Sequence, residues 1–225
     1  MLDSAAIAGA LRAGIRLRDK VIVLAVGATR DPARIDAIAA DLALARALGA
    51  QVLTVAPAGE GPLPLDAQGP ALRLIAALER HGERGVALPA AGLVTIHRVP
   101  LAAATPGVPT MIPVVNTTVI VHLLALGYLP VLFAPAVDAE GGAVDLGAGA
   151  LAVFLAQFMG AALLLLSLDG APMDAPPAGV GLPPIPPIVV TDPASPGRLI
   201  ADMLHHTTQV PVAPTSVAAS NATLP

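Results

Sequence analysis

The stretch that decides the fold begins with Thr117-Thr-Val-Ile-Val-His-Leu-Leu-Ala-Leu126. This run has the apolar spacing of an amphipathic helix, and it stops at Gly127. A glycine in that place is typical of a helix C-terminus, because the left-handed conformation there is costly for a residue with a Cβ atom. The run Leu129 to Phe133 follows and is apolar and strand-like.

The second half of the stretch repeats this order. A turn over residues 138–142 leads to an apolar helix candidate over 148–159, which stops at Gly160. Leu163-Leu-Leu-Leu-Ser167 then reads as a strand buried on both faces. The order helix, strand, turn, helix, strand is typical of a parallel sheet covered by helices.

The residues before this stretch fit the same architecture. Val21 to Val26 predicts a buried strand, Asp31-Pro32 predicts a capped helix start, and Gln51 to Val55 predicts a second strand, which together make a βαβ unit. Further predicted elements are helices over 5–18, 70–81 and 195–204 and a strand over 85–88. An alternating run over 93–99 predicts an edge strand or one half of a hairpin, followed by a Pro/Ala loop. We also expect Arg34, Asp41 and Arg46 to lie on the solvated outer face of the helix that starts at Asp31.

The expected fold is therefore a single α/β domain, a mostly parallel sheet with helices on both faces. We assign residues 1–174 to this domain. Residues 175–225 read as a Pro-rich crossing, a short helix and a tail that packs on the same domain.

Composition excludes several classes of protein. A formal charge of -4 and a pI near 5.6 argue against nucleic-acid binding, which needs clustered lysine and arginine. The absence of cysteine excludes disulfide frameworks, zinc fingers and thiolate catalysis. Eleven of the twelve basic residues lie between Arg12 and Arg98, and the twelfth is Arg198. The five histidines show no ligand spacing, so we predict no metal site.

The run from Ala148 to Leu166 could span a bilayer by hydropathy alone. Because Gly149 and Gly160 bracket a short helix within it, we expect a buried helix followed by a strand, and no membrane span. Met1 to Arg18 mixes charge with apolar residues and lacks the separate basic and apolar blocks of a signal peptide. We therefore expect a cytoplasmic protein.

In element order and apolar pattern the chain resembles the amino-acid kinase family, and acetylglutamate kinase in particular. The resemblance covers about residues 5 to 174. It rests on the first strand and its helix, on Leu48-Gly-Ala-Gln-Val-Leu-Thr-Val55, and most closely on Leu126-Gly-Tyr-Leu-Pro-Val131 and Val137-Asp-Ala-Glu-Gly141. It implies a shortened fold of the carbamate kinase-like type, ATP and Mg²⁺ as cofactors, a small-molecule ligand and a homo-oligomer. The implied reaction is phosphorylation of the N-acetylglutamate side-chain carboxylate by ATP in arginine biosynthesis.

The resemblance also implies where ligands would bind. The candidate nucleotide-binding and phosphate-binding residues are Gly27, Thr29, Arg30, Gly59, Ser167 and Asp169. The candidate substrate-binding residues are Asn116 and Asp145. Local structure offers a simpler account of several of these, since asparagine caps helices and serine and aspartate are ordinary turn residues.

This sequence departs from the family at the positions where the family carries its catalytic and phosphate-binding residues. The lysine that the family places after the first strand falls at Ala25, and the second glycine of that loop falls at Ala28. Lys20 cannot replace it, because that side chain starts the strand and lies roughly 20 Å from Gly27 at about 3.3 Å per residue.

The other motifs are lost in the same way. The histidine and first two glycines of the second loop fall at 56–58, and the family's Asn-x-Asn-x-Asp signature falls at Asp145, Gly147 and Gly149. The strand-end aspartate falls at Leu168, and no lysine follows Lys20. Removing one electrostatic donor typically costs about a hundred- to a thousandfold in rate. We therefore predict little or no kinase activity and name no catalytic residue.

Three hypotheses stay open on the sequence. The first is an acetylglutamate kinase relative whose phosphotransferase activity is weak or lost. The second is a non-catalytic pseudokinase, a binding subunit or an artificial sequence that keeps only the fold. The third is a membrane-associated protein.

Overall fold

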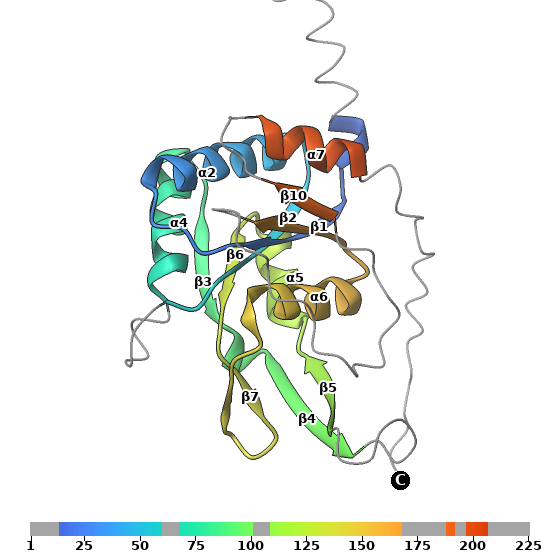
Figure 1. The fold of residues 1–225 in the computed structure, drawn as a ribbon. Helices are drawn as coiled ribbons and strands as arrows, with labels where there is room; N and C mark the ends of the chain where they lie inside the picture. Colours follow the sequence, from blue (N-terminus) through green and yellow to red (C-terminus); the bar gives the residue numbers. More distant parts are fainter. Residues whose placement is uncertain (1–13, 60–67, 101–108, 168–187, 192–196, 207–225) are drawn as a thin grey trace, which may run out of the picture.

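A computed structural model of the chain describes residues 14–59, 68–100, 109–167, 188–191 and 197–206. Its centre is a six-stranded parallel sheet with the order β10-β9-β1-β2-β6-β3 (Figure 1). The strands are β1 (Val21–Val26), β2 (Gln51–Ala56), β3 (Gly85–Pro89), β6 (Leu129–Phe133), β9 (Ala162–Ser167) and β10 (Ile188–Thr191). The apolar runs that predicted β1, β2, β3, β6 and β9 are confirmed as strands.

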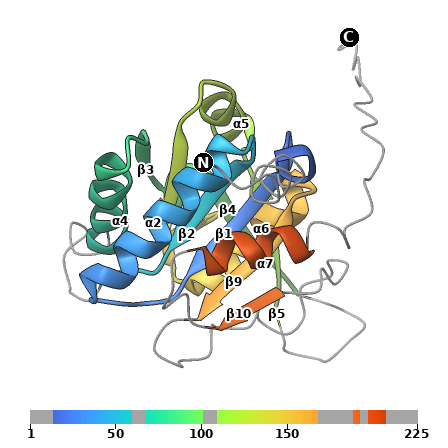
Figure 2. The ribbon, with the colours of Figure 1, turned by 90° about the horizontal axis from the view of Figure 1, so that it is seen from above.

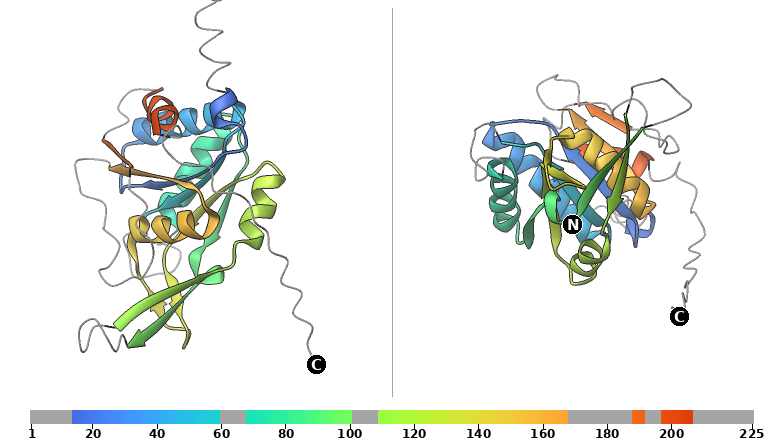
Figure 3. Two further views of the ribbon diagram at one scale, coloured as in Figure 1. Left: turned by 90° about the vertical axis from the view of Figure 1, so that its right-hand side faces the viewer. Right: turned by 90° about the horizontal axis from the view of Figure 1, so that it is seen from below.

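Helices cover both faces of this sheet. One face carries α2 (Pro32–Ala47), α4 (Gly69–Arg80) and α7 (Arg198–His206), which lie over the strands in Figure 2. The other face carries α5 (Thr118–Ala125) and α6 (Gly147–Met159) (Figure 3). Alternate residues of each strand point to the two layers, so that Leu24 joins the core under α2 and Val23 joins the core under α6. The predicted α/β fold with helices on both faces is confirmed.

The long apolar run over 148–166 divides where the sequence predicts. Gly160 ends α6 in the left-handed conformation with φ 59°, and β9 begins two residues later. Helix and strand are therefore two short elements that pack against each other and against β1. Among the described residues, no helix has the length and apolar character needed to cross a membrane.

A second sheet of four strands, with the order β5-β4-β7-β8, projects from the α6 side of the domain (Figures 1 and 3). Its strands are β4 (Val94–Pro100), β5 (Pro109–Val115), β7 (Ala136–Asp138) and β8 (Ala143–Val144), and a 3-10 turn, Ala90–Gly92, precedes β4. The prediction of a loop after residue 99 is wrong from Pro109 onward, because β5 begins there and pairs antiparallel with β4. Pro109 and Pro113 are tolerated because β5 is an edge strand.

The prediction that Asp41 lies on a solvated outer face of α2 is also wrong, because this residue is only 3% exposed. Its carboxylate accepts hydrogen bonds from the backbone N–H groups of Gly197 at 2.6 Å and Leu199 at 3.0 Å, at the start of α7. Burial raises the pKa of Asp41 above its ordinary value, and these backbone hydrogen bonds oppose that shift. Arg46 is likewise mostly shielded and pairs with Glu83.

Thr54 is the other buried polar side chain of the described core, and its hydroxyl has no hydrogen-bond partner there. Since an unsatisfied buried hydroxyl is costly, Thr54→Val is expected to raise the free energy of unfolding by about 1 kcal/mol and the Tm by about 2 to 4 °C. Thermal and urea unfolding would measure this. The reverse change at the neighbouring buried position on the same strand face, Val52→Thr, should destabilise the protein by a similar amount. A lower Tm for Thr54→Val would show that the hydroxyl has a partner.

Candidate functional site

The candidate site lies at the carboxyl edge of the main sheet. All six strands are parallel, so their carboxyl ends meet at one edge, where ligands of open α/β sheets bind. Helices α2, α5 and α6 start beside this edge because each follows a strand or turn that ends there. The predicted residues Gly27, Thr29, Gly59 and Ser167 follow or end strands β1, β2 and β9, and the fold therefore brings them to this edge.

The loop between β1 and α2 is held by its own hydrogen bonds. The N–H of Gly27 donates to the carbonyl of Leu166 on β9 at 2.8 Å, which extends the strand ladder by one residue. The hydroxyl of Thr29 accepts from the N–H of Asp31 at 3.2 Å, and the carboxylate of Asp31 accepts from the N–H of Ala33 at 3.0 Å. Pro32, the first residue of α2, has no N–H group to offer.

This arrangement disfavours an anion at the start of α2. A helix N-terminus attracts phosphate through its free N–H groups and its dipole. Here the carboxylate of Asp31 takes that place, as the sequence predicts for a helix cap, and the guanidinium of Arg34 lies 3.6 Å from it. A phosphate at this point would meet a fixed negative charge.

A small hollow of about 20 Å³ opens where β1 and β2 end. This is room for about one water molecule. None of the described residues that line it is charged. Its lining residues come from the ends of β1 and β2 and from helices α2 and α4: Val26, Gly27, Thr29, Ile35, Ile38, Ala56, Pro57, Pro70 and Leu74.

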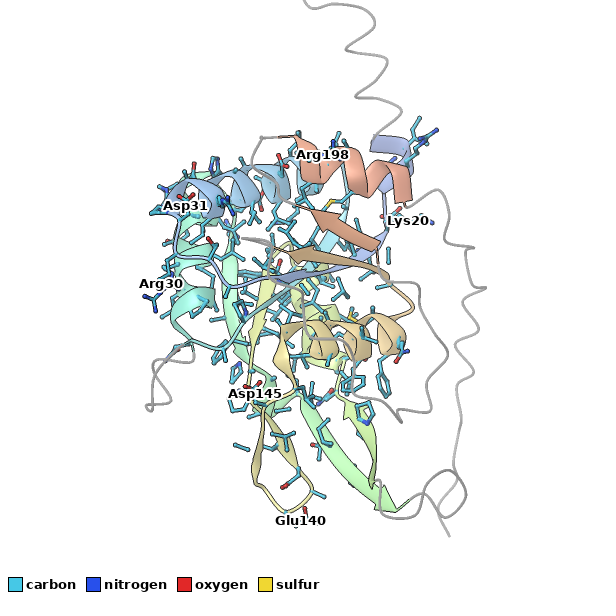
Figure 4. The ribbon with its side chains drawn as sticks, in the orientation of Figure 1. Lys20, Arg30, Asp31, Glu140, Asp145 and Arg198 are labelled. Atoms are coloured by element: carbon cyan, nitrogen blue, oxygen red, sulfur yellow. The ribbon has the colours of Figure 1, made fainter. Side chains whose placement is uncertain are left out.

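The described cations nearest in sequence to the first loop do not line this hollow. Arg30 is exposed, and its side chain points away from the sheet (Figure 4). Lys20 lies at the opposite end of β1, as the sequence predicts (Figure 4). Arg198 sits at the start of α7, in the outer helix layer, and is exposed.

The remaining candidates for nucleotide binding are Gly59, Ser167 and Asp169, and the structure describes less of their surroundings. Gly59 follows β2 and is the last described residue of its loop. Ser167 ends β9 and is paired in register with Thr191 of β10. Asp169 lies outside the described residues.

Both substrate candidates accept a hydrogen bond from a backbone N–H group two residues further on, just before or at the start of a helix. The side-chain oxygen of Asn116 accepts from the N–H of Thr118 at 3.2 Å, at the start of α5. The carboxylate of Asp145 accepts from the N–H of Gly147 at 2.9 Å, at the start of α6. Both side chains are exposed, and Asp145 sits where the β7–β8 hairpin joins α6 (Figure 4). The local roles expected from asparagine and aspartate are present, and a binding role stays a prediction.

The described residues do not fit MgATP. No group of three or more His, Asp or Glu side chains in the described part of the chain could hold a metal ion. The hollow is too small for a nucleotide and too apolar for phosphate. We therefore derive no phosphoryl-transfer step through these residues.

Sequence reasoning missed the buried carboxylate of Asp41. The available signal was an aspartate enclosed by apolar residues, Ala39-Ala40-Asp41-Leu42-Ala43. A charge in such surroundings needs a partner, and the partner here lies on α7, about 156 residues further along the chain.

No protein-family model matches the sequence, and no curated protein matches it either. Solved structures do match the fold. N-acetylglutamate synthase from Neisseria gonorrhoeae, complexed with coenzyme A and N-acetyl-glutamate, superposes with a TM-score of 0.58 at 15% identity, over 80% of this chain and 48% of that one. The same enzyme complexed with coenzyme A and L-arginine gives 0.53 at 16% identity, over 75% and 48% of the two chains.

Aspartate kinase from Synechocystis superposes with a TM-score of 0.50 at 16% identity, over 65% of this chain and 28% of that one. The chain thus spans about half the length of the synthase and less than a third of the aspartate kinase. At these identities the similarity shows the fold alone: the chain has an amino-acid kinase fold.

Proposed function

We propose that the chain is an acetylglutamate kinase-like domain that keeps the fold without phosphoryl transfer and serves as a non-catalytic small-molecule-binding subunit. The observation that carries this proposal is the loop between β1 and α2. Its glycine N–H is bound to Leu166, and its helix N-terminus is capped by Asp31.

Charge supports the same proposal. Phosphoryl transfer depends on cations and N–H groups aimed at the transferred phosphoryl group. Asp31 adds a carboxylate at the start of α2, and Asp145 adds another where the β7–β8 hairpin joins α6 (Figure 4). Arg30 points outward from the carboxyl edge of the sheet, so a triphosphate there would meet repulsion with little compensation.

The test is an assay with MgATP and N-acetylglutamate in which hydroxylamine traps the acyl phosphate. We expect no product above a control without protein. Asp31→Asn, which removes the charge and keeps the cap, serves as the matched variant, and it should also form no product. Turnover well above the control by the unchanged protein would overturn the proposal.

Ligand binding without turnover needs a separate measurement. A thermal shift series with ATP, N-acetylglutamate and L-arginine would separate silent binding from none. We expect no shift with ATP, with or without Mg²⁺. A shift with either amino acid, reduced in Asn116→Ala or Asp145→Ala, would support binding at the caps of α5 and α6.

A second candidate is residual phosphorylation of N-acetylglutamate by ATP. It is favoured by the TM-score of 0.58 with N-acetylglutamate synthase, which was solved with N-acetyl-glutamate. The acyl-phosphate assay decides between the two candidates, because only this one gives product that depends on both substrates.

We also propose that the subunit forms a homo-oligomer through α5. Val121, within this helix, is 51% exposed, and Leu126, at its C-cap, is 69% exposed. The helix α5 carries no Asp, Glu, Lys or Arg. Light scattering after gel filtration would give the mass. The pair Val121→Glu and Leu126→Glu should yield monomers, whereas Leu72→Glu, at an exposed position of α4, should leave the mass unchanged. A monomeric unchanged protein would contradict this proposal.

A further inference from the structure

We propose that β10 and α7 form one detachable unit that Asp41 fastens to the rest of the domain. The unit opens as a piece while the remaining five strands of the sheet stay folded. This inference concerns the mechanics of the fold and does not depend on the proposed function.

The unit sits at the periphery of the sheet. Among the described strands β10 lies at the edge of the sheet, and it pairs with β9 over Ile188 to Thr191. Removing it leaves a sheet of order β9-β1-β2-β6-β3, in which β1 keeps both neighbours. Peripheral elements with few partners open at lower free energy than the centre of a domain.

The described buried side chains of α7 lie on one face of the helix. Leu199, Ile200 and Met203 are buried in the core layer shared with α2, while Arg198 and Ala201 are exposed. The helix contacts α2 and β10 (Figures 1 and 2). One apolar face of a nine-residue helix therefore carries its docking, since helices of this length are marginal on their own.

Asp41 adds polar contacts to this docking. Its two carboxylate oxygens accept from Gly197 and Leu199, so that a side chain of α2 caps the first turn of α7. Such a cap satisfies N–H groups that the helix leaves unbonded, and a charged acceptor strengthens these bonds. Without this carboxylate, α7 loses the cap of its first turn and the hydrogen bonds that join it to Asp41 of α2, while its apolar contacts with α2 remain.

Opening of the unit has a structural consequence for β9. Residues Leu164 to Ser167 pair with β10 in the closed form, and they become an unpaired edge when the unit leaves. An exposed parallel edge of apolar residues is a template for another strand. Asp41 thus controls whether the sheet ends at β10 or at β9.

Hydrogen exchange measured by mass spectrometry tests the proposal on the full chain. In Asp41→Ala, we expect backbone amides in 188–191 and 198–206 to exchange about 30-fold faster than in the unchanged protein, as loss of a charged cap predicts. Amides of β1 and β2 should keep their rates. Asp36→Ala is the matched control, since Asp36 lies on the same helix, is more exposed and bonds to Arg80 on α4.

Three results would overturn the proposal. They are unchanged exchange of 198–206 in Asp41→Ala, faster exchange of α7 without β10, and an equal rise in β1 and β2. If Asp41→Ala does not fold, exchange of the unchanged protein in rising denaturant replaces it. Amides of 188–191 and 198–206 should then open together, with a smaller denaturant dependence than β1. A single opening shared by all strands would contradict a separate unit.

Discussion

Phe154→Ala is expected to lower the free energy of unfolding by about 4 kcal/mol. Phe154 is fully buried at the centre of α6, in the layer that also holds Val23, Leu53 and Ile120. The whole sequence holds three phenylalanines and one tyrosine, so the core consists mainly of aliphatic side chains. These cannot expand to fill the space that a phenyl ring leaves, so the cavity persists in the variant.

Phe158→Ala is the matched control, because it is the same substitution in the same helix. Phe158 is 45% exposed, and its loss should change the free energy of unfolding by no more than about 0.5 kcal/mol. Urea unfolding followed by circular dichroism gives both values. Equal effects of the two substitutions would mean that α6 does not bury the face described here.

Gly85→Ala is expected to destabilise the protein by about 2 kcal/mol through overpacking. Gly85 starts β3, and a Cβ atom there would lie 2.9 Å from Cγ1 and 3.2 Å from Cγ2 of Ile75 on α4. These atoms sit close to the backbone of α4, so relief requires a shift of the helix or a strained side chain. Glycine therefore permits α4 to approach the edge of the sheet.

A double-mutant cycle measures this contact. Ile75→Ala removes both Cγ atoms, and adding it to Gly85→Ala should cost at least about 1 kcal/mol less than the sum of the single changes. Gly92→Ala is the control, because nothing lies within 4 Å of a Cβ atom there. Additive effects of the two changes would show that the loss at Gly85 comes from the backbone and not from Ile75.

Sequence patterns predicted most of the main sheet because its signals are local. The unbroken apolar runs of β1 and β6 mark strands buried on both faces, and Asp31-Pro32 and Gly160 mark helix ends through their own backbone preferences. Each of these features depends on a few neighbouring residues. These elements can therefore be predicted without reading any polar motif.

Features that depend on distant residues escaped prediction. β5 contains two prolines, and only its position at an edge permits them. Nothing local to Asp41 reveals that Gly197 and Leu199 will supply hydrogen bonds. The sequence also predicted which loops end the strands, but the outward direction of Arg30 and the size of the hollow depend on how α2 and α4 pack.

The position of β1 at the middle of the sheet affects synthesis of the chain. Ile22 pairs with Val52 on one side, but with Ala162 on the other. A ribosome that adds about 5 to 20 residues per second needs on the order of ten seconds to travel from one partner to the other. During that interval the edge of β1 that will pair with β9 stays unpaired. A chaperone that covers this apolar edge should raise the yield of native protein.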